Sequence, residues 1–155
     1  MTDDSEFEVL LAEPFGQALE MVEAALKNEA FEVVTRFDVQ RTMKDKLHVA
    51  LRPYVILGAC NNRIAEQILK SDPCVALTMP CNISVEVTAD EQTLVRVADP
   101  AQLVSCKCNE DPLVLDIADD ASRRLTQVIR TLRSNTRPND PNSKTWKRLS
   151  SEVND

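Results

Sequence analysis

The segment Tyr54-Val55-Ile56-Leu57-Gly58-Ala59-Cys60-Asn61 is a continuous apolar run that ends in a cysteine and an asparagine. An apolar run of this length is typical of a central strand that is buried on both faces. Asn61 or Asn62 is a suitable N-cap for a helix that Asp72-Pro73 ends. The segment therefore predicts a central strand that leads directly into a helix.

Alternating and helical patterns on both sides of this segment predict a mixed α+β fold around a single sheet, in the order β-α-β-β-α-β-β-β-α. The polar stretch 38–46 is expected to form a short helix or a lid. One domain is predicted over residues 5–133, followed by a flexible C-terminal tail over residues 134–155. The predicted elements are strands at 7–11, 31–37, 54–59, 75–79, 83–87 and 94–97, and helices at 14–30, 61–71 and 111–132.

Composition excludes several classes of protein. Eighteen basic residues against twenty-five acidic ones leave a formal charge of −7, which is the wrong sign for binding nucleic acid or an anionic membrane. The two glycines, Gly16 and Gly58, are too far apart to form a phosphate-cradling loop, and the single histidine excludes a three-histidine metal site within one chain.

The five cysteines are an odd number, and the acidic N-terminus lacks the apolar core of a signal peptide. No apolar run approaches the roughly 20 residues that a membrane helix needs. We therefore expect a cytoplasmic protein whose cysteines are free thiols. Cys74 is expected in the core, and the Cys106-Lys107-Cys108 spacing is a weak metal signal.

Cys60 and Cys81 are the strongest candidates for ligand binding or redox chemistry. Cys60 lies where the central strand ends and a helix begins, a position that favours a thiolate with a lowered pKa. If 54–59 and 75–79 are neighbouring parallel strands, both cysteines lie at the same carboxyl edge of the sheet, where open α/β sheets bind ligands. The alternative interpretation is that Asn61 and Asn82 form strand-end turns and the cysteines only fill the core.

The paired motifs resemble those of the bacterial domain-of-unknown-function family 302. The resemblance rests on the segment 54–61 together with Met79-Pro80-Cys81-Asn82, on Phe31 to Val39, on Lys44-Asp45-Lys46-Leu47 and on Val97-Ala98-Asp99-Pro100, and it covers residues 6–132. It implies a small α+β fold that commonly forms a homodimer, and it implies no particular reaction.

Lys46 matches the family pattern, whereas His48 and Asn62 depart from it, because glycine and proline are usual at those two positions. A lysine beside two cysteines favours thiolates and binds an anion, and its alternative is a solvated charge in a loop. His48 inherits no role from the family; it completes a His-Cys-Cys metal site with Cys60 and Cys81, or else it is a surface residue.

Three hypotheses follow, and a binding domain is favoured over an enzyme. In the first, Cys60, Cys81, Asn61, Asn82 and Lys46 hold a soft metal ion such as zinc, or a thiol-reactive small ligand. In the second, the protein is a thiol-disulfide oxidoreductase in which Cys60 attacks and Cys81 resolves. In the third, the protein is a dimeric interaction module whose cysteines are structural.

Overall fold

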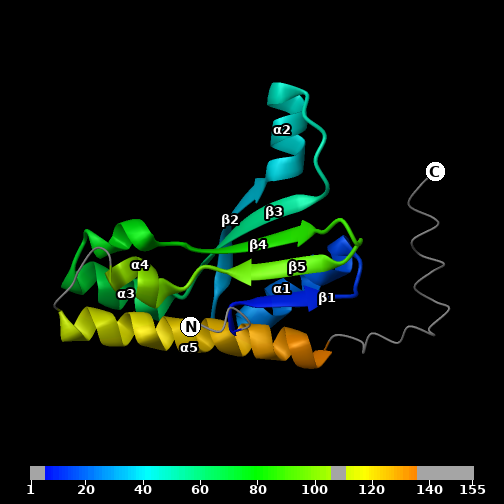
Figure 1. The fold of residues 1–155 in the computed structure, drawn as a ribbon. Helices are drawn as coiled ribbons and strands as arrows, with labels where there is room; N and C mark the ends of the chain where they lie inside the picture. Colours follow the sequence, from blue (N-terminus) through cyan, green and yellow to red (C-terminus); the bar gives the residue numbers. More distant parts are fainter. Residues whose placement is uncertain (1–5, 106–110, 136–155) are drawn as a thin grey trace.

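The apolar run forms the strand that it predicts, β3 (Tyr54–Cys60), which lies between two neighbouring strands of one five-stranded sheet. The computed structural model describes residues 6–105 and 111–135, and Figure 1 shows their arrangement. The elements are β1 (Glu8–Leu11), α1 (Phe15–Asn28), β2 (Glu32–Asp38), α2 (Val39–Leu47), β3 (Tyr54–Cys60), α3 (Asn62–Ser71), the 3-10 helix η2 (Val75–Thr78), β4 (Cys81–Val87), β5 (Thr93–Val97), α4 (Pro100–Ser105) and α5 (Pro112–Asn135).

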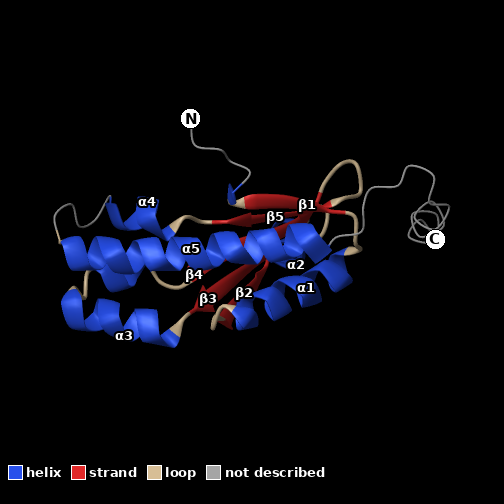
Figure 2. Cartoon of the chain, turned by 90° about the horizontal axis from the view of Figure 1, so that it is seen from below, coloured by secondary structure: helices blue, strands red, loops and turns tan. Residues whose placement is uncertain are grey.

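The α+β class and the single sheet are confirmed, but every strand pairing is antiparallel, in the order β1-β5-β4-β3-β2. The mixed sheet that we expected is therefore wrong. The alternating pattern of apolar and polar residues predicted adjacent strands here, and β4 and β5 form an antiparallel hairpin in which Ile83 pairs with Val97. The helices α1 and α5 lie on one face of the sheet, as Figure 2 shows.

The predicted strand at 75–79 is the main error in the element order. Asp72 accepts a hydrogen bond from the Cys74 N–H at 2.9 Å, and the N–H groups of Val75 and Ala76 bond to carbonyls three residues back. The segment therefore winds into η2, and Val75 is fully buried without joining the sheet. A short apolar run does not distinguish a strand from a buried helical turn. The helix α4 was not predicted.

A β-bulge explains why the alternation in 31–37 does not mark a buried face. The register between β2 and β3 shifts between Val33 and Thr35. Before the shift Val33 packs against the core, and after it Phe37 pairs with Ile56 and is 45% exposed. One extra residue moves every later side chain to the other face of the sheet. The predicted first helix also ends early, because Ala30 adopts a left-handed φ of 61°.

The core consists of two clusters along α5. The larger one lies between the sheet, α1 and the C-terminal half of α5, and it includes Leu26, Leu57 and Ile129. The smaller one joins α3, η2 and α4 to the N-terminal half of α5 through residues such as Ile68 and Val114. The helix extends to Asn135, two residues into the predicted tail. The rest of that tail, and the Cys106-Lys107-Cys108 motif, lie outside the described residues.

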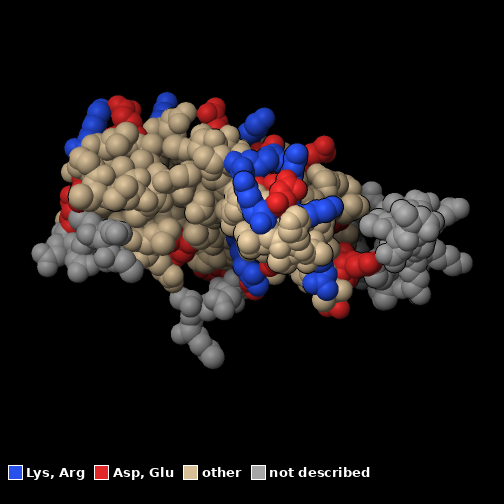
Figure 3. All heavy atoms as spheres, turned by 90° about the horizontal axis from the view of Figure 1, so that it is seen from above, with Lys and Arg blue, Asp and Glu red and all other residues tan. Residues whose placement is uncertain are grey.

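The polar stretch 38–46 forms the helix α2, which projects from the sheet (Figure 1) and has no buried residue. We call α2 and the return segment 48–53 the arm. Figure 3 shows the face opposite α1 and α5. Lysine and arginine side chains gather there with acidic ones over α2, and the surface beside α2 is largely uncharged. Three apolar side chains of the arm are exposed, Leu47 by 64%, Val49 by 43% and Leu51 by 41%.

Candidate functional site

Cys60 and Cys81 lie at the same end of the sheet, offset by one residue in the register of β3 and β4. The strand arrangement that brings them together differs from the expected one. Cys60 is the last residue of β3 and Cys81 is the first residue of β4, and these strands are adjacent and antiparallel. Ala59 is the register partner of Cys81. The expectation of two parallel strands is therefore wrong, although the end of one antiparallel strand and the start of the next bring both residues to one edge.

The pleat of the ladder directs the two cysteines to opposite faces. Ala59 and Cys81 are partners and so share the face that packs against the helices, where Cys81 contacts the larger core cluster. Cys60, one residue on from Ala59, points to the other face together with its own partner in β2, Glu32. A disulfide between Cys60 and Cys81 would therefore require the end of the ladder to open.

The electrostatics oppose the expected thiolate. Burial, followed by the charge of Glu32, raises the pKa of Cys60 above its ordinary value of 9.0. Burial, followed by the neighbouring Cys60, raises the pKa of Cys81 to about 11. Both side chains are thiols at neutral pH, so the lowered pKa predicted for Cys60 is wrong. Asn61 stands between Cys60 and the first turn of α3.

Asn61 has a structural role that the sequence predicted. Its side-chain oxygen accepts a hydrogen bond from the Ile64 N–H at 3.2 Å, and its amide nitrogen donates to the Glu29 carbonyl at 3.3 Å. The first bond caps α3 and the second ties the helix to the chain after α1. Asn82 is exposed and pairs with Gly58 across the ladder.

Gly58 is required by close packing. A Cβ atom at this position would lie 2.1 Å from the Thr35 Oγ1 atom and 2.7 Å from the Pro80 Cγ atom. Only glycine lets β2 and Pro80 approach the strand so closely. Gly58 therefore helps to hold Cys60 and Cys81 at the same edge.

A cavity of about 30 Å³ lies beside the cysteines, where the two core clusters meet. Cys60, Cys81 and Met79 contribute to its wall, and we call it the sulfur cavity. Apart from Asn61 and Thr78, the other side chains of the wall are apolar: Phe31, Ala59, Ile64, Ala65, Ile68, Pro100, Val104, Ala118 and Ala121.

The polar groups of the sulfur cavity are already used. Both ends of the Asn61 amide are hydrogen-bonded, and the Thr78 hydroxyl donates to the Val75 carbonyl at 2.6 Å. Among the described residues, sulfur atoms are therefore the donors left to a ligand in this cavity. The space accommodates one ion or about two water molecules.

Lys46 and His48 are not brought to the cysteines. Both lie at the end of α2, which follows Asp38, and Asp38 is at the opposite end of β2 from Glu32, the partner of Cys60. His48 ends α2 in a left-handed conformation with a φ of 56°. The described residues contain no group of three or more histidine, cysteine, aspartate and glutamate side chains that could hold a metal ion. Within one chain the His-Cys-Cys site is therefore not assembled.

Cys74 is exposed, which corrects the expectation that it lies in the core. It precedes η2, and the loss of the predicted strand places it at the surface. Of the described cysteines, Cys74 therefore offers a control for experiments on Cys60 and Cys81.

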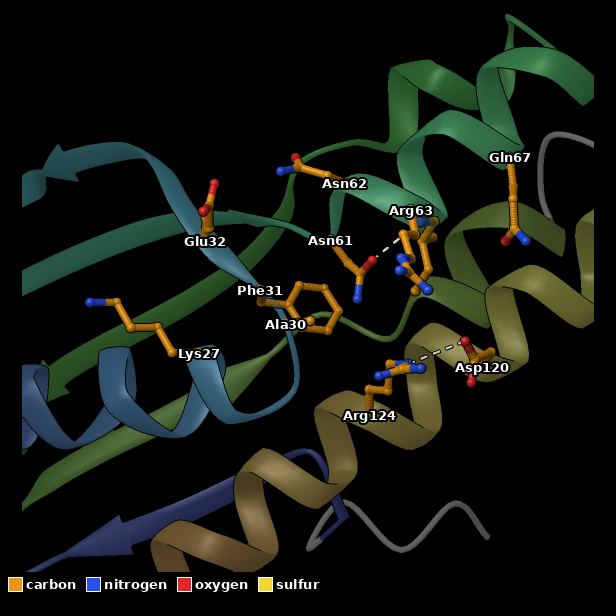
Figure 4. Close-up of a pocket in the computed structure, with 11 residues that line it drawn as sticks. Lys27, Ala30, Phe31, Glu32, Asn61, Asn62, Arg63, Gln67, Asp120 and Arg124 are labelled. Carbon is orange, nitrogen blue, oxygen red and sulfur yellow. Dashed lines mark hydrogen bonds and ion pairs between the residues drawn. The ribbon is translucent and has the colours of Figure 1, made fainter.

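A second, larger hollow was missed by sequence reasoning. It has a volume of about 770 Å³ and lies between the end of α1, the start of β2, α3 and α5. Figure 4 shows Arg63 of α3 and Arg124 of α5 extending toward one another across it, with Lys27 at its far side. We call it the basic hollow. Arg63 and Arg124 are 61 positions apart, so no local pattern in the sequence pairs them.

A single antiparallel sheet with α1 and α5 on one face, and two cavities at its end, defines this protein as a small one-sheet α+β domain. The chain belongs to the family described as domain of unknown function DUF302, whose sequence model matches residues 7–132. The family that the cysteine motifs predicted is thereby confirmed, and the roles of the motif residues stay predictions.

The chain is similar to the crystal structure of an uncharacterized conserved DUF302 protein from Bacillus stearothermophilus. The two are 28% identical with a TM-score of 0.75, and the match covers 82% of this chain and 97% of that one. No curated protein matches the chain. None of the helices in the described residues combines the length and the apolar character needed to cross a membrane.

Proposed function

We propose that the domain binds a soft metal ion in the sulfur cavity, with Cys81 and Met79 as ligands from inside and Cys60 at the edge. The observation that carries this proposal is the donor set: Cys81 and Met79, with Cys60 at the edge, belong to the wall of an otherwise apolar space whose amide and hydroxyl groups are already hydrogen-bonded. Thiolate and thioether ligands favour a soft ion such as Cu(I). Zinc, which takes four donors in structural sites, fits this set less well.

The volume of the sulfur cavity favours an ion over a thiol-reactive small ligand, because about 30 Å³ is too small for an organic molecule. Binding replaces the S–H bond of each coordinating thiol by a bond from sulfur to the metal, and the proton passes to solvent. No electron transfer is needed if the ion arrives as Cu(I). The raised pKa of Cys81 makes this deprotonation the costly step.

The experiment is native mass spectrometry of reduced protein after addition of one equivalent of Cu(I). One ion per chain is expected for the wild type and for Cys74→Ser, which changes an exposed cysteine outside the cavity. Loss of the ion is expected for Cys81→Ser, and weaker retention against a competing Cu(I) chelator for Met79→Leu. Equal retention by Cys81→Ser and the wild type would refute the proposal.

The thiol-disulfide oxidoreductase has less support. Its attacking group must be a thiolate, whereas the pKa of Cys60 is raised, and its resolving thiol faces the other side of the ladder. Mass analysis after mild oxidation tests it directly. An intramolecular disulfide between Cys60 and Cys81 that forms and reduces reversibly would favour this function over ion binding.

A second copy of the chain is our proposed partner, and it would cover the arm. The arm and β2 expose apolar side chains, among them Val34 by 54% and Leu47 by 64%, and a nine-residue helix without a buried residue gains little stability alone. β2 is also an edge strand, and two copies of an edge strand can pair antiparallel about a two-fold axis.

Light scattering during size-exclusion chromatography tests this assembly. The wild type is expected to be a dimer, and the double substitution Leu47→Glu and Val49→Glu is expected to give a monomer. Leu77→Glu is the matched control, because Leu77 is 79% exposed in η2, away from the arm. A monomeric wild type, or equal dissociation by the control, would refute the proposal.

A further inference from the structure

The basic hollow is large enough for a small organic molecule and is open to solvent. Its volume of about 770 Å³ falls in the usual range for small-molecule sites, roughly 300 to 1,000 Å³. Phe31 and Ile64 belong to its wall and also to that of the sulfur cavity, so these side chains separate the two spaces. The hollow is therefore a distinct site.

Two guanidinium groups from different helices converge in this hollow. The Arg63 guanidinium has no hydrogen bond or ion pair with another described residue, and Figure 4 shows it directed toward Arg124. Arg124 uses its Nε atom to bond to Asp120 at 3.2 Å, which leaves its two terminal nitrogens without a partner among the described residues. Two facing cations are repulsive unless an anion lies between them.

The other charged side chains of the hollow do not place an anion between Arg63 and Arg124. Lys27 adds a third cation at the far side, and its ammonium is not paired within the described part of the chain. Of the two acidic side chains, Asp120 is bonded to Arg123 and Arg124, and Glu32 is turned away from the arginines in Figure 4. A protein with a formal charge of −7 thus keeps three cations around one hollow.

We infer that the basic hollow binds a small phosphorylated organic molecule, with its phosphate group between Arg63 and Arg124. A phosphate monoester carries close to two negative charges at neutral pH and accepts paired hydrogen bonds from guanidinium groups. The Asn62 and Gln67 side chains in the wall offer further polar contacts, and the exposed Ala30 side chain offers a small apolar surface to the organic part. This inference does not depend on the proposed metal site.

The test is a titration of the reduced, full-length protein with phenyl phosphate, followed by amide chemical shifts in NMR. Inorganic phosphate and benzoate are the comparison probes, since one lacks the organic part and the other carries a single charge. Saturable shifts are expected at Arg63, Gln67 and Arg124, with the tightest binding for phenyl phosphate. Binding of benzoate as tight as that of phenyl phosphate would overturn the assignment of a phosphate group.

Three substitutions of equal charge change complete the experiment. Arg63→Gln and Arg124→Gln are each expected to weaken phenyl phosphate about tenfold or more, the loss expected from one charge-assisted hydrogen bond. Arg123→Gln is the matched control, because Arg123 neighbours Arg124 and pairs with the same Asp120, yet its side chain is 77% exposed and outside the hollow. It should change the affinity less than twofold.

Equal weakening by all three substitutions would show general attraction to positive charge and would overturn the site. The absence of saturable shifts with phenyl phosphate in the folded wild type would also overturn it. Thermal unfolding of each variant without ligand identifies a substitution that has damaged the fold. In that case Arg63→Lys, which keeps the charge but loses the paired geometry, replaces the affected variant and is expected to weaken binding in the same direction.

Discussion

The sulfur cavity and the basic hollow share Phe31, Asn61 and Ile64 in their walls, but they offer opposite chemistry. The sulfur cavity is about 30 Å³ and mostly apolar, and its wall includes Met79 and Cys81, whose pKa is raised by burial. The basic hollow is about 770 Å³, open, and surrounded by solvated cations. One layer of side chains is therefore enough to separate the proposed soft-ion site from the proposed anion site, because burial decides which donor groups remain available.

Removal of the shared wall should have the largest effect. Phe31 is 1% exposed and contributes to both cavities. Phe31→Ala is expected to lower the free energy of unfolding by about 3 to 5 kcal/mol, through lost burial and the cavity left behind. Urea unfolding measures this loss, with the partly buried Phe15→Ala as the control. A loss below about 1 kcal/mol would mean that the wall is not a packed partition.

Asn61 should have the next largest effect, since it makes two hydrogen bonds at 6% exposure. Asn61→Ala is expected to cost about 2 kcal/mol, from the lost cap and an unsatisfied backbone. Asn61→Asp keeps the acceptor for the Ile64 N–H and loses only the donor to Glu29, so about half of the stability loss is expected. Equal losses in both variants would show that the cap contributes little.

The thiol of Cys81 predicts a dependence of stability on pH. Its pKa is 9.0 in the unfolded chain and about 11 in the folded one. As pH rises above 9 the unfolded chain releases its proton first, so stability is complete below pH 9 and is lost up to about pH 11. The loss of unfolding free energy over this range is about 3 kcal/mol. Unfolding free energies of the wild type and Cys81→Ala should converge or cross between pH 8 and pH 10.5, and a constant difference would contradict the burial of this thiol.

The smallest effect on the free energy of unfolding is expected from a substitution at His48 in the arm. His48 adopts a left-handed φ of 56°, which glycine adopts without strain. His48→Gly is therefore expected to raise the free energy of unfolding by about 0.5 to 1 kcal/mol. Cu(I) retention should stay unchanged, because the arm lies at the other end of β2 from Cys60. A variant that no longer retains Cu(I) would place His48 in the metal site, for example across a dimer.

Much of the fold follows from local pattern, and the exceptions have definite causes. The strand predicted at 54–59 and the Asn61 cap match their predicted roles. The bulge in β2 and the helical turn η2 do not, because each depends on how a short segment meets its neighbours. The antiparallel direction of β4 relative to β3 likewise depends on how the segment before β4 packs against its neighbours.

The candidate sites also combine features that the sequence motifs predicted with features that only the folded sheet produces. The motifs predicted Cys60 and Cys81 at one edge only through two parallel strands, whereas an antiparallel pair brings them there. The pleat that separates their faces and the burial that raises their pKa values also arise only in the assembled sheet. Lys46 was placed beside them by a family pattern, and it lies on the projecting arm instead. Residues adjacent in a motif need not be adjacent in space.

Local residue order is sufficient for the α+β class, the strand that begins at Tyr54 and the Asn61 cap, because periodicity and capping are properties of the chain itself. The antiparallel register, the two clusters along α5 and the approach of Arg63 to Arg124 depend on contacts between distant segments. Packing free energy selects those contacts, and it is shared among many residues. No single motif therefore encodes the sulfur cavity or the basic hollow.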